Sequence, residues 1–164
     1  MSEARWPVIR SANSADAEII FQFIVELATY ERAPDAVETT PQILRQQLAL
    51  TRPPFECLLA FDDSGEPVGF ALFFETYSTW KGRPGLHLED LYVTESARGQ
   101  GFGLALLKAV QAIADARDYP RLEWAVLDWN EPAIEFYRAY GAQPLDDWTT
   151  WRLCLDGLSA DDNG

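Results

Sequence analysis

The stretch that decides the fold reads Leu88-Glu89-Asp90-Leu91-Tyr92-Val93 and, after four further residues, Arg98-Gly99-Gln100-Gly101-Phe102-Gly103. The first segment has the apolar and aromatic content of a strand, and the second is a glycine-rich turn. Apolar residues then recur at helical spacing, at Leu106, Leu107, Val110, Ile113 and Ala114. The stretch predicts a strand over residues 86–93, a turn over residues 98–103 and a helix directly after the turn.

A glycine-rich turn that opens a helix is suited to binding phosphate. The first N–H groups of a helix have no intrahelical partner, and the helix dipole adds positive potential at that end. Glycines let a ligand approach the backbone, and Arg98 adds a charge that pairs with phosphate. The turn lacks both the GxGxxG and the GK[ST] patterns. It predicts a phosphate or pyrophosphate site, or alternatively only a tight connection between strand and helix.

Helical patterns lie on both sides of this stretch. Ser14 is the predicted N-cap of a helix whose apolar face is Ile20, Phe23, Ile24 and Leu27. Thr40 and Pro41 predict the start of a second helix, which runs to about Leu50. Asn130 is predicted to cap a last helix that reaches about Tyr140.

Strand patterns alternate with these helices. We expect further strands over residues 6–9, 56–61, 67–76, 122–127 and 148–155, with a hairpin loop at residues 62–65 in which Gly65 takes a positive φ. This order predicts an α/β fold, with a mixed sheet and helices on its faces.

Length and charge narrow the class of protein. The 164 residues suit one domain over residues 1–158, followed by a flexible tail over residues 159–164. No segment resembles a signal peptide or a membrane helix, and Cys57 and Cys154 lie in predicted strands as buried thiols, so we expect a cytoplasmic protein. The net charge of −13 disfavours nucleic acid; it attracts a cationic substrate, or alternatively serves only solubility.

Several segments together resemble one enzyme family. Arg98-x-x-Gly101-x-Gly103 is similar to the [QR]-x-x-G-x-[GA] coenzyme A motif of the GNAT superfamily of N-acetyltransferases. The Leu88–Val93 segment and the run Asp128-Trp129-Asn130-Glu131-Pro132-Ala133-Ile134-Glu135-Phe136-Tyr137 resemble the diamine (spermidine/spermine) acetyltransferases and the related thialysine acetyltransferases. The resemblance spans nearly the whole chain. It departs from the family after Tyr137, where Ala139 and Tyr140 stand in place of a basic run, so a coenzyme contact is not extended to Tyr140.

The resemblance implies a fold and a cofactor. The fold is a central mixed, mostly antiparallel sheet flanked by helices on both faces, and the cosubstrate is acetyl-CoA, without a metal. A homodimer is implied as well, with a small-molecule amine as the other partner and neither nucleic acid nor membrane. The implied cofactor-binding residues are Leu91, Tyr92, Val93, Arg98, Gly99, Gln100, Gly101, Phe102, Gly103, Leu104, Asn130, Glu131, Pro132 and Ala133.

Two side chains carry the implied chemistry. Tyr137 stands at the family's general-acid position, and a phenol stays protonated at neutral pH; alternatively it is a core tyrosine. Glu89 is the candidate for taking the proton of the substrate ammonium, or alternatively pairs with an arginine. Strict strand alternation predicts that Glu89 shares a face with His87, Leu91 and Val93, and that Asp90 points to the other side.

The resemblance places Tyr30, Glu31 and Trp80, with Glu89, at the amine, where aromatic faces and a carboxylate suit an alkylammonium. We therefore expect direct acetyl transfer from acetyl-CoA to a polyamine or a lysine-like amino acid. The alternatives are another amine, such as an antibiotic or a protein lysine, or a non-catalytic coenzyme A-binding dimer.

Overall fold

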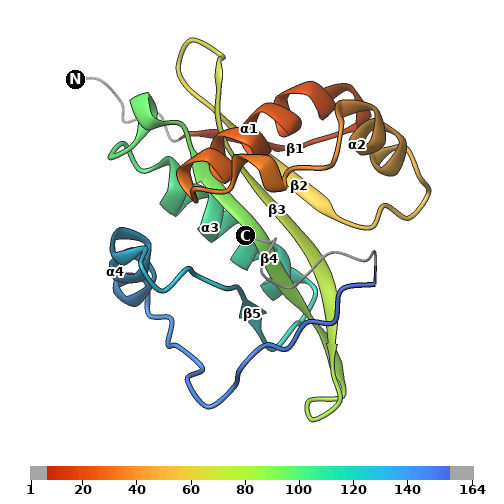
Figure 1. Cartoon of the computed structure of the whole chain (residues 1–164), viewed down its shortest axis with the longest axis vertical. Helices are drawn as coiled ribbons and strands as arrows, with labels where there is room; N and C mark the ends of the chain where they lie inside the picture. Colours follow the sequence, from red (N-terminus) through yellow and green to blue (C-terminus); the bar gives the residue numbers. More distant parts are fainter. Residues whose placement is uncertain (1–6, 156–164) are drawn as a thin grey trace.

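A five-stranded sheet forms the centre of the computed structural model, which describes residues 7–155 (Figure 1). Its strands lie in the order β1 (Val8–Ser11), β2 (Glu56–Phe61), β3 (Pro67–Ser78), β4 (Arg83–Val93) and β5 (Leu122–Glu123). Neighbours from β1 to β4 run antiparallel, and β4 and β5 run parallel. The prediction of a mixed, mostly antiparallel sheet is confirmed.

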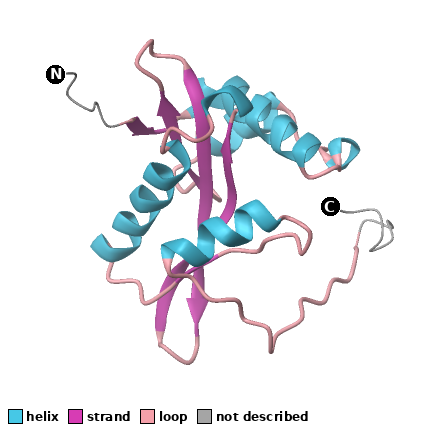
Figure 2. Cartoon of the chain, turned by 90° about the vertical axis from the view of Figure 1, so that its left-hand side faces the viewer, coloured by secondary structure: helices cyan, strands magenta, loops and turns pink. Residues whose placement is uncertain are grey.

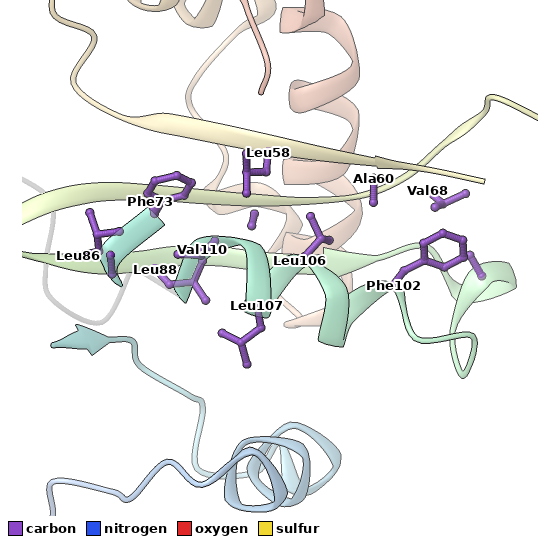
Figure 3. Packing of buried hydrophobic residues seen from close by; sticks show 13 residues of the cluster. Leu58, Ala60, Val68, Phe73, Leu86, Leu88, Phe102, Leu106, Leu107 and Val110 are labelled. Carbon is purple, nitrogen blue, oxygen red and sulfur yellow. The ribbon is translucent and has the colours of Figure 1, made fainter. Parts of the chain in front are cut away.

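Helices cover both faces of this sheet, as predicted (Figure 2). The helices of the described part are α1 (Ala17–Tyr30), α2 (Pro41–Leu48), α3 (Phe102–Ala116) and α4 (Glu131–Tyr140). On one face α1 and α2 bury Phe23 and Leu44 against Phe70 of the sheet. On the other, Leu106 and Val110 of α3 pack on strand side chains (Figure 3). Burial of these apolar side chains is the main force that holds the layers together.

The parallel pair β4 and β5 separates soon after it forms. Only Leu86–Leu122 and His87–Glu123 are paired, and the chain beyond Glu123 leaves β4 toward α4. The predicted strand over residues 122–127 is therefore much shorter than expected. Residues 88–93 of β4 are left without a neighbouring strand on that side. Backbone N–H and C=O groups along this edge can therefore form hydrogen bonds with another group.

A β-bulge divides β4 into two registers. Phe73 of β3 pairs with Leu88, but the preceding Leu72 pairs with Asp90, so Glu89 has no partner. Leu88 and Leu91 consequently both pack on the α3 side of the sheet. Strict alternation across residues 86–93 was therefore the wrong expectation, because a bulge inserts one residue and reverses the faces that follow.

The predicted final strand over residues 148–155 is not formed. Residues 141–155 contain neither helix nor strand and run along the outside of the molecule (Figure 1). We call residues 145–155 the C-terminal arm. Its large apolar side chains are exposed, Trp151 to 91%, and Cys154 is only half-buried in a loop rather than buried in a strand. A strand pattern needs a neighbouring strand to bond its backbone, and the arm pairs with none within residues 7–155.

Several boundaries differ by a few residues from the predictions. Ser14 is not the N-cap of α1: a 3-10 turn (Ser14–Asp16), capped by Asn13 whose side chain accepts from the Ala15 N–H, precedes α1, and Asp16 stands at the N-cap of α1. The first strand begins at Val8, and the predicted Trp6 lies outside the described residues, as does the predicted tail at residues 159–164. The caps at Thr40 and Asn130 and the positive φ of Gly65 are confirmed. Within residues 7–155, no helix is long and apolar enough to cross a membrane.

Candidate active site

The turn before α3 has the backbone shape of an anion cradle. Gly99 and Gly101 have φ values of 76° and 90°, which favour glycine, and a Cβ on either would meet open space within 4 Å. The Ala105 N–H donates to Gly101 O, which is the first intrahelical hydrogen bond of α3. The three N–H groups before it, of Phe102, Gly103 and Leu104, therefore have no partner within the helix. The cradle therefore offers free donors at a positive helix end.

Arg98 folds back from this turn over β4. Its Nε donates to the carbonyl oxygen of Val93 at 3.0 Å, which satisfies part of the unpaired strand edge. Its guanidinium lies 5.0 Å from the ring centroid of Tyr30 and 5.6 Å from that of Tyr92. These cation–π contacts connect the turn to the end of α1.

Changing Gly101 to alanine is expected to weaken acetyl-CoA binding about tenfold. A residue with a Cβ is strained by about 1–2 kcal/mol at the φ of 90° that Gly101 adopts. The turn relieves this strain by changing its backbone conformation, and the cradle then loses the shape that binds the anion. Calorimetric titration with acetyl-CoA measures the effect. Gly82→Ala is the matched control, because Gly82 also has a positive φ, 64°, with open space where its Cβ would stand, but lies in the β3–β4 hairpin rather than in this turn. Equal affinities for the two variants would contradict this prediction.

Three carboxylates gather on the α1 side of β4. The bulge turns both Glu89 and Asp90 toward Glu31, the residue that ends α1. His87 Nε2 lies 3.4 Å from Glu89 Oε2, so Glu89 pairs with a histidine rather than with the arginine that the alternative interpretation expected. The prediction that Asp90 points away from Glu89 is wrong, because the bulge brings both adjacent acids to one face.

Burial and mutual repulsion raise the pKa of two of these carboxyl groups. Burial, with the charges of Glu89 and Glu31, raises the pKa of Asp90 to about 7. Burial and the charge of Glu89 also raise the pKa of Glu31. Like charges in a partly dry site disfavour ionisation of these groups, and a bound cation would relieve the repulsion. The cluster is thus suited electrostatically to an ammonium group.

Tyr137 lies on α4 close to the same cluster. Its ring packs at 4.8 Å from Trp124 and 5.2 Å from Phe136, measured between centroids. Burial, with the charge of Glu31, raises the pKa of Tyr137 to about 12. The hydroxyl is therefore protonated across the physiological range and available as a proton donor.

Asn130 fixes the start of α4. Its Oδ1 accepts from the Ala133 N–H at 3.4 Å and also from the Tyr30 hydroxyl at 3.0 Å. Pro132 stands in the first turn, where its missing N–H costs nothing. The N-terminal end of α4 is thus joined to the C-terminal end of α1, 100 residues earlier in the chain.

Most of the predicted site residues converge, and one does not. Arg98, Tyr30 and Asn130 form one connected group, and Glu31 links Glu89 to Tyr137 electrostatically. Trp80 instead lies at the β3–β4 hairpin tip, 85% exposed, where its ring is 6.4 Å from that of Trp148 in the C-terminal arm. Figure 1 shows this tip at the end of the sheet away from α1.

Sequence reasoning missed Asp90, Arg32 and Trp129 as members of this region. The guanidinium of Arg32 lies 4.0 Å from the centroid of Trp129, and Arg32 has a φ of 65°. The signal for Asp90 was its position beside Glu89, which regular alternation discounted. Within the described residues, no group of three or more His, Cys, Asp or Glu side chains is arranged to hold a metal.

Comparison with known proteins gives concordant matches. The model of the Acetyltransferase (GNAT) family matches residues 21–142. A thialysine N-epsilon-acetyltransferase of Bos taurus is 40% identical over 151 residues, covering 88% of each chain. The spermidine/spermine N(1)-acetyltransferase-like protein 1 of Homo sapiens is 36% identical over 88% of this chain and 22% of its own length. The structure of an aminoglycoside acetyltransferase from an uncultured soil sample superposes with a TM-score of 0.76 at 16% identity, covering 91% of this chain and 96% of that one.

Proposed function

The chain belongs to the GNAT acetyltransferase family, and from this premise we propose that it acetylates a primary amine of a polyamine or a lysine-like amino acid. An acyl-CoA-dependent N-acetyltransferase of this family needs a site for the coenzyme, a site for the amine and two proton-transferring groups. The observation that carries the proposal is the convergence of Glu31, Glu89 and Tyr137 beside the unpaired edge of β4.

The chain's residues fit a bound coenzyme A. The open cradle at Gly99 and Gly101, with the free N–H groups after it, suits the pyrophosphate, and Arg98 adds positive charge. We assign residues 99–104 to the pyrophosphate, residues 91–93 to the acetyl group and pantetheine, and residues 130–133 to the pantetheine arm. When bound, acetyl-CoA supplies a thioester whose carbonyl carbon is open to attack by an amine.

The protein's part in the reaction is to place and move protons. Glu89, 55% exposed, accepts a proton from the substrate ammonium, directly or through water, and so frees the nitrogen lone pair. Tyr137 holds its proton at Oη for the sulfur that leaves. Cys57 is buried, and burial together with the charges of Asp90 and Asp16 raises the pKa of its thiol, so it is not an acetyl carrier. The burial of Cys57 supports direct transfer from acetyl-CoA to the amine.

The acidic cluster supports a cationic amine as the acceptor. Glu31, Glu89 and Asp90 together offer more negative charge than one ammonium neutralises, which favours a molecule with a second positive group. The similar proteins named for thialysine and for spermidine/spermine point to two such substrate types. An antibiotic or protein lysine, and coenzyme binding without catalysis, are the competing functions.

An acetylation assay tests the proposal. Purified protein is mixed with acetyl-CoA, and thiol release is followed against spermidine, spermine, putrescine, thialysine, lysine, an aminoglycoside and a histone-tail peptide. Turnover on a polyamine or on thialysine supports the proposal and identifies the branch. Turnover confined to the aminoglycoside or the peptide moves the function to that substrate. Binding of acetyl-CoA without turnover on any amine would leave a coenzyme-binding protein.

Changing Asp90 to asparagine is expected to stabilise the protein at pH 8 more than at pH 5. The folded pKa of Asp90, about 7, exceeds its ordinary 3.8, so the folded chain binds more protons. The stability this provides is present at low pH and is lost as pH rises through about 7. Asparagine does not ionise, so the gain over wild type should grow by roughly 2–3 kcal/mol between pH 5 and pH 8. Urea denaturation at the two pH values measures the free energy of unfolding of both proteins. A difference between variant and wild type that did not change with pH would contradict the prediction.

We propose that the protein is a homodimer held partly by the C-terminal arm. A strand-like segment with exposed apolar side chains gains both backbone bonds and burial when a second copy covers it. Light scattering should give twice the mass of one chain, and Trp151→Asp with Leu153→Asp should give the monomer. A wild-type monomer would refute the dimer. The free thiol of Cys57 supports a reducing, cytoplasmic location.

A further inference from the structure

The helix that carries Tyr137 is held at its start by the last residues of α1. The Tyr30 hydroxyl donates to Asn130 Oδ1, the same oxygen that caps α4 through the Ala133 N–H. One acceptor thus serves a tertiary contact and a helix cap together. The shared acceptor joins Tyr30 to the first turn of α4, and Tyr137 lies two turns from that cap.

Aromatic contacts reinforce this connection. The ring of Tyr30 is 6.1 Å from the ring of Trp129, between centroids, and the guanidinium of Arg32 lies 4.0 Å from the Trp129 centroid. The left-handed conformation of Arg32, φ 65°, turns its side chain back toward this tryptophan. We call Tyr30, Arg32, Trp129 and Asn130 the clasp.

The clasp spans the place where the sheet opens. Because β4 and β5 stay paired over only two residues each, the segment from β5 to α4 is not fixed to β4 by strand hydrogen bonds beyond Glu123. At its other end, α4 is tied to α3 by the hydroxyl of Tyr140 and the side chain of Gln111. Two contacts therefore hold α4, and with it Tyr137: the clasp at its start and the contact between Tyr140 and Gln111 at its end. The clasp is the one nearer the acidic cluster.

We propose that Tyr30 is a positioning residue, which sets the place of the Tyr137 hydroxyl through Asn130 and α4, rather than a residue that binds the amine. The geometry supports this reassignment, because the Tyr30 hydroxyl is engaged by Asn130 and its ring contacts Arg98 and Trp129. Its catalytic consequence rests on the proposed function, in which Tyr137 donates the proton.

Kinetics separate the two roles of Tyr30. Tyr30→Phe keeps the ring contacts and removes only the hydroxyl, so kcat should fall roughly 3- to 10-fold, the effect of one hydrogen bond, with KM for the amine unchanged. Tyr119→Phe is the matched control, since it removes a hydroxyl bonded to Glu75 and far from the clasp. A rise in the amine KM with kcat unchanged would overturn the proposal, because it is the signature of a substrate contact.

Hydrogen exchange tests the clasp without any substrate. In Tyr30→Phe, amides of residues 133–137 should exchange roughly 3- to 10-fold faster, while those of α3 keep their rates. Asn130→Ala should accelerate the same amides, and Asn130→Asp should restore them, because aspartate keeps an acceptor oxygen for both Tyr30 and Ala133.

The two readouts distinguish the clasp from the enzymatic proposal. Faster exchange in α4 with no acetylation by wild-type protein would support the clasp and reject the proposed function. Acetylation by wild type with unchanged exchange in both Tyr30→Phe and Asn130→Ala would overturn the clasp and leave the function standing.

Discussion

Replacing Tyr137 with phenylalanine is expected to lower kcat by about 10²- to 10⁴-fold, the contribution of a positioned general acid. The ring contacts with Trp124 and Phe136 remain, so the fold and the affinity for acetyl-CoA should not change. The departing thiolate must then take its proton from water. Stopped-flow or steady-state thiol release at saturating substrates measures the loss.

The pH dependence of the wild-type enzyme gives a second check on Tyr137. Because its pKa is about 12, kcat should not decline through ionisation of this tyrosine below about pH 11. Tyr119→Phe controls for the loss of a tyrosine hydroxyl elsewhere and should keep its activity. If Tyr137→Phe retained more than a tenth of the wild-type kcat, another group would have to supply the proton.

Replacing Glu89 with glutamine should have the other large effect, about a 10²-fold lower kcat/KM at pH 7. Glutamine has nearly the same shape but cannot accept the ammonium proton. The defect should shrink as the pH rises toward 9 or 10, because more of the substrate amine is then already neutral. A pH profile of kcat/KM for wild type and variant measures this recovery.

Two variants test whether the effect belongs to Glu89. Glu135→Gln removes an exposed carboxylate from α4 and should leave the profile unchanged. Asp90→Asn removes the neighbouring acid, whose carboxyl is more buried and whose pKa is raised to about 7 by burial and by the charges of Glu89 and Glu31. If Asp90→Asn lost more activity than Glu89→Gln at pH 7, or if the Glu89→Gln defect were the same at every pH, the base would be assigned to the wrong carboxylate.

Local signals explain what could be predicted from the sequence. The turn at Gly99 and Gly101 was predicted because positive φ values and a following helical pattern are decided within a few residues. The cap at Asn130 was predicted for the same reason. The family resemblance then added the fold and the roles of the residues, which spacing alone does not reveal.

The larger errors depend on pairing with distant segments. The bulge at Glu89 is set by the register against Leu72 and Phe73, which no pattern within residues 86–93 reveals. The C-terminal arm has strand-forming residues but pairs with no strand in the described part of the chain. The contact between Tyr30 and Asn130 joins residues 100 positions apart, and only the folded chain brings them together.

The bulge in β4 also gives the strand an unusual tolerance to a change in its gene. The residues of β4 up to Leu88 pair regularly with β3, and so do the residues from Asp90 through Leu91 onward. Glu89 is the one extra residue between these two regular parts. Loss of the codon for Asp90 would let Glu89 pair with Leu72 and join the two registers into one ladder, with both leucines still facing α3. A one-residue deletion in a regular strand moves every following side chain to the opposite face, whereas here we expect it to keep the faces and to remove one negative charge from the amine site. Evolution can therefore adjust the charge of this site by length as well as by substitution.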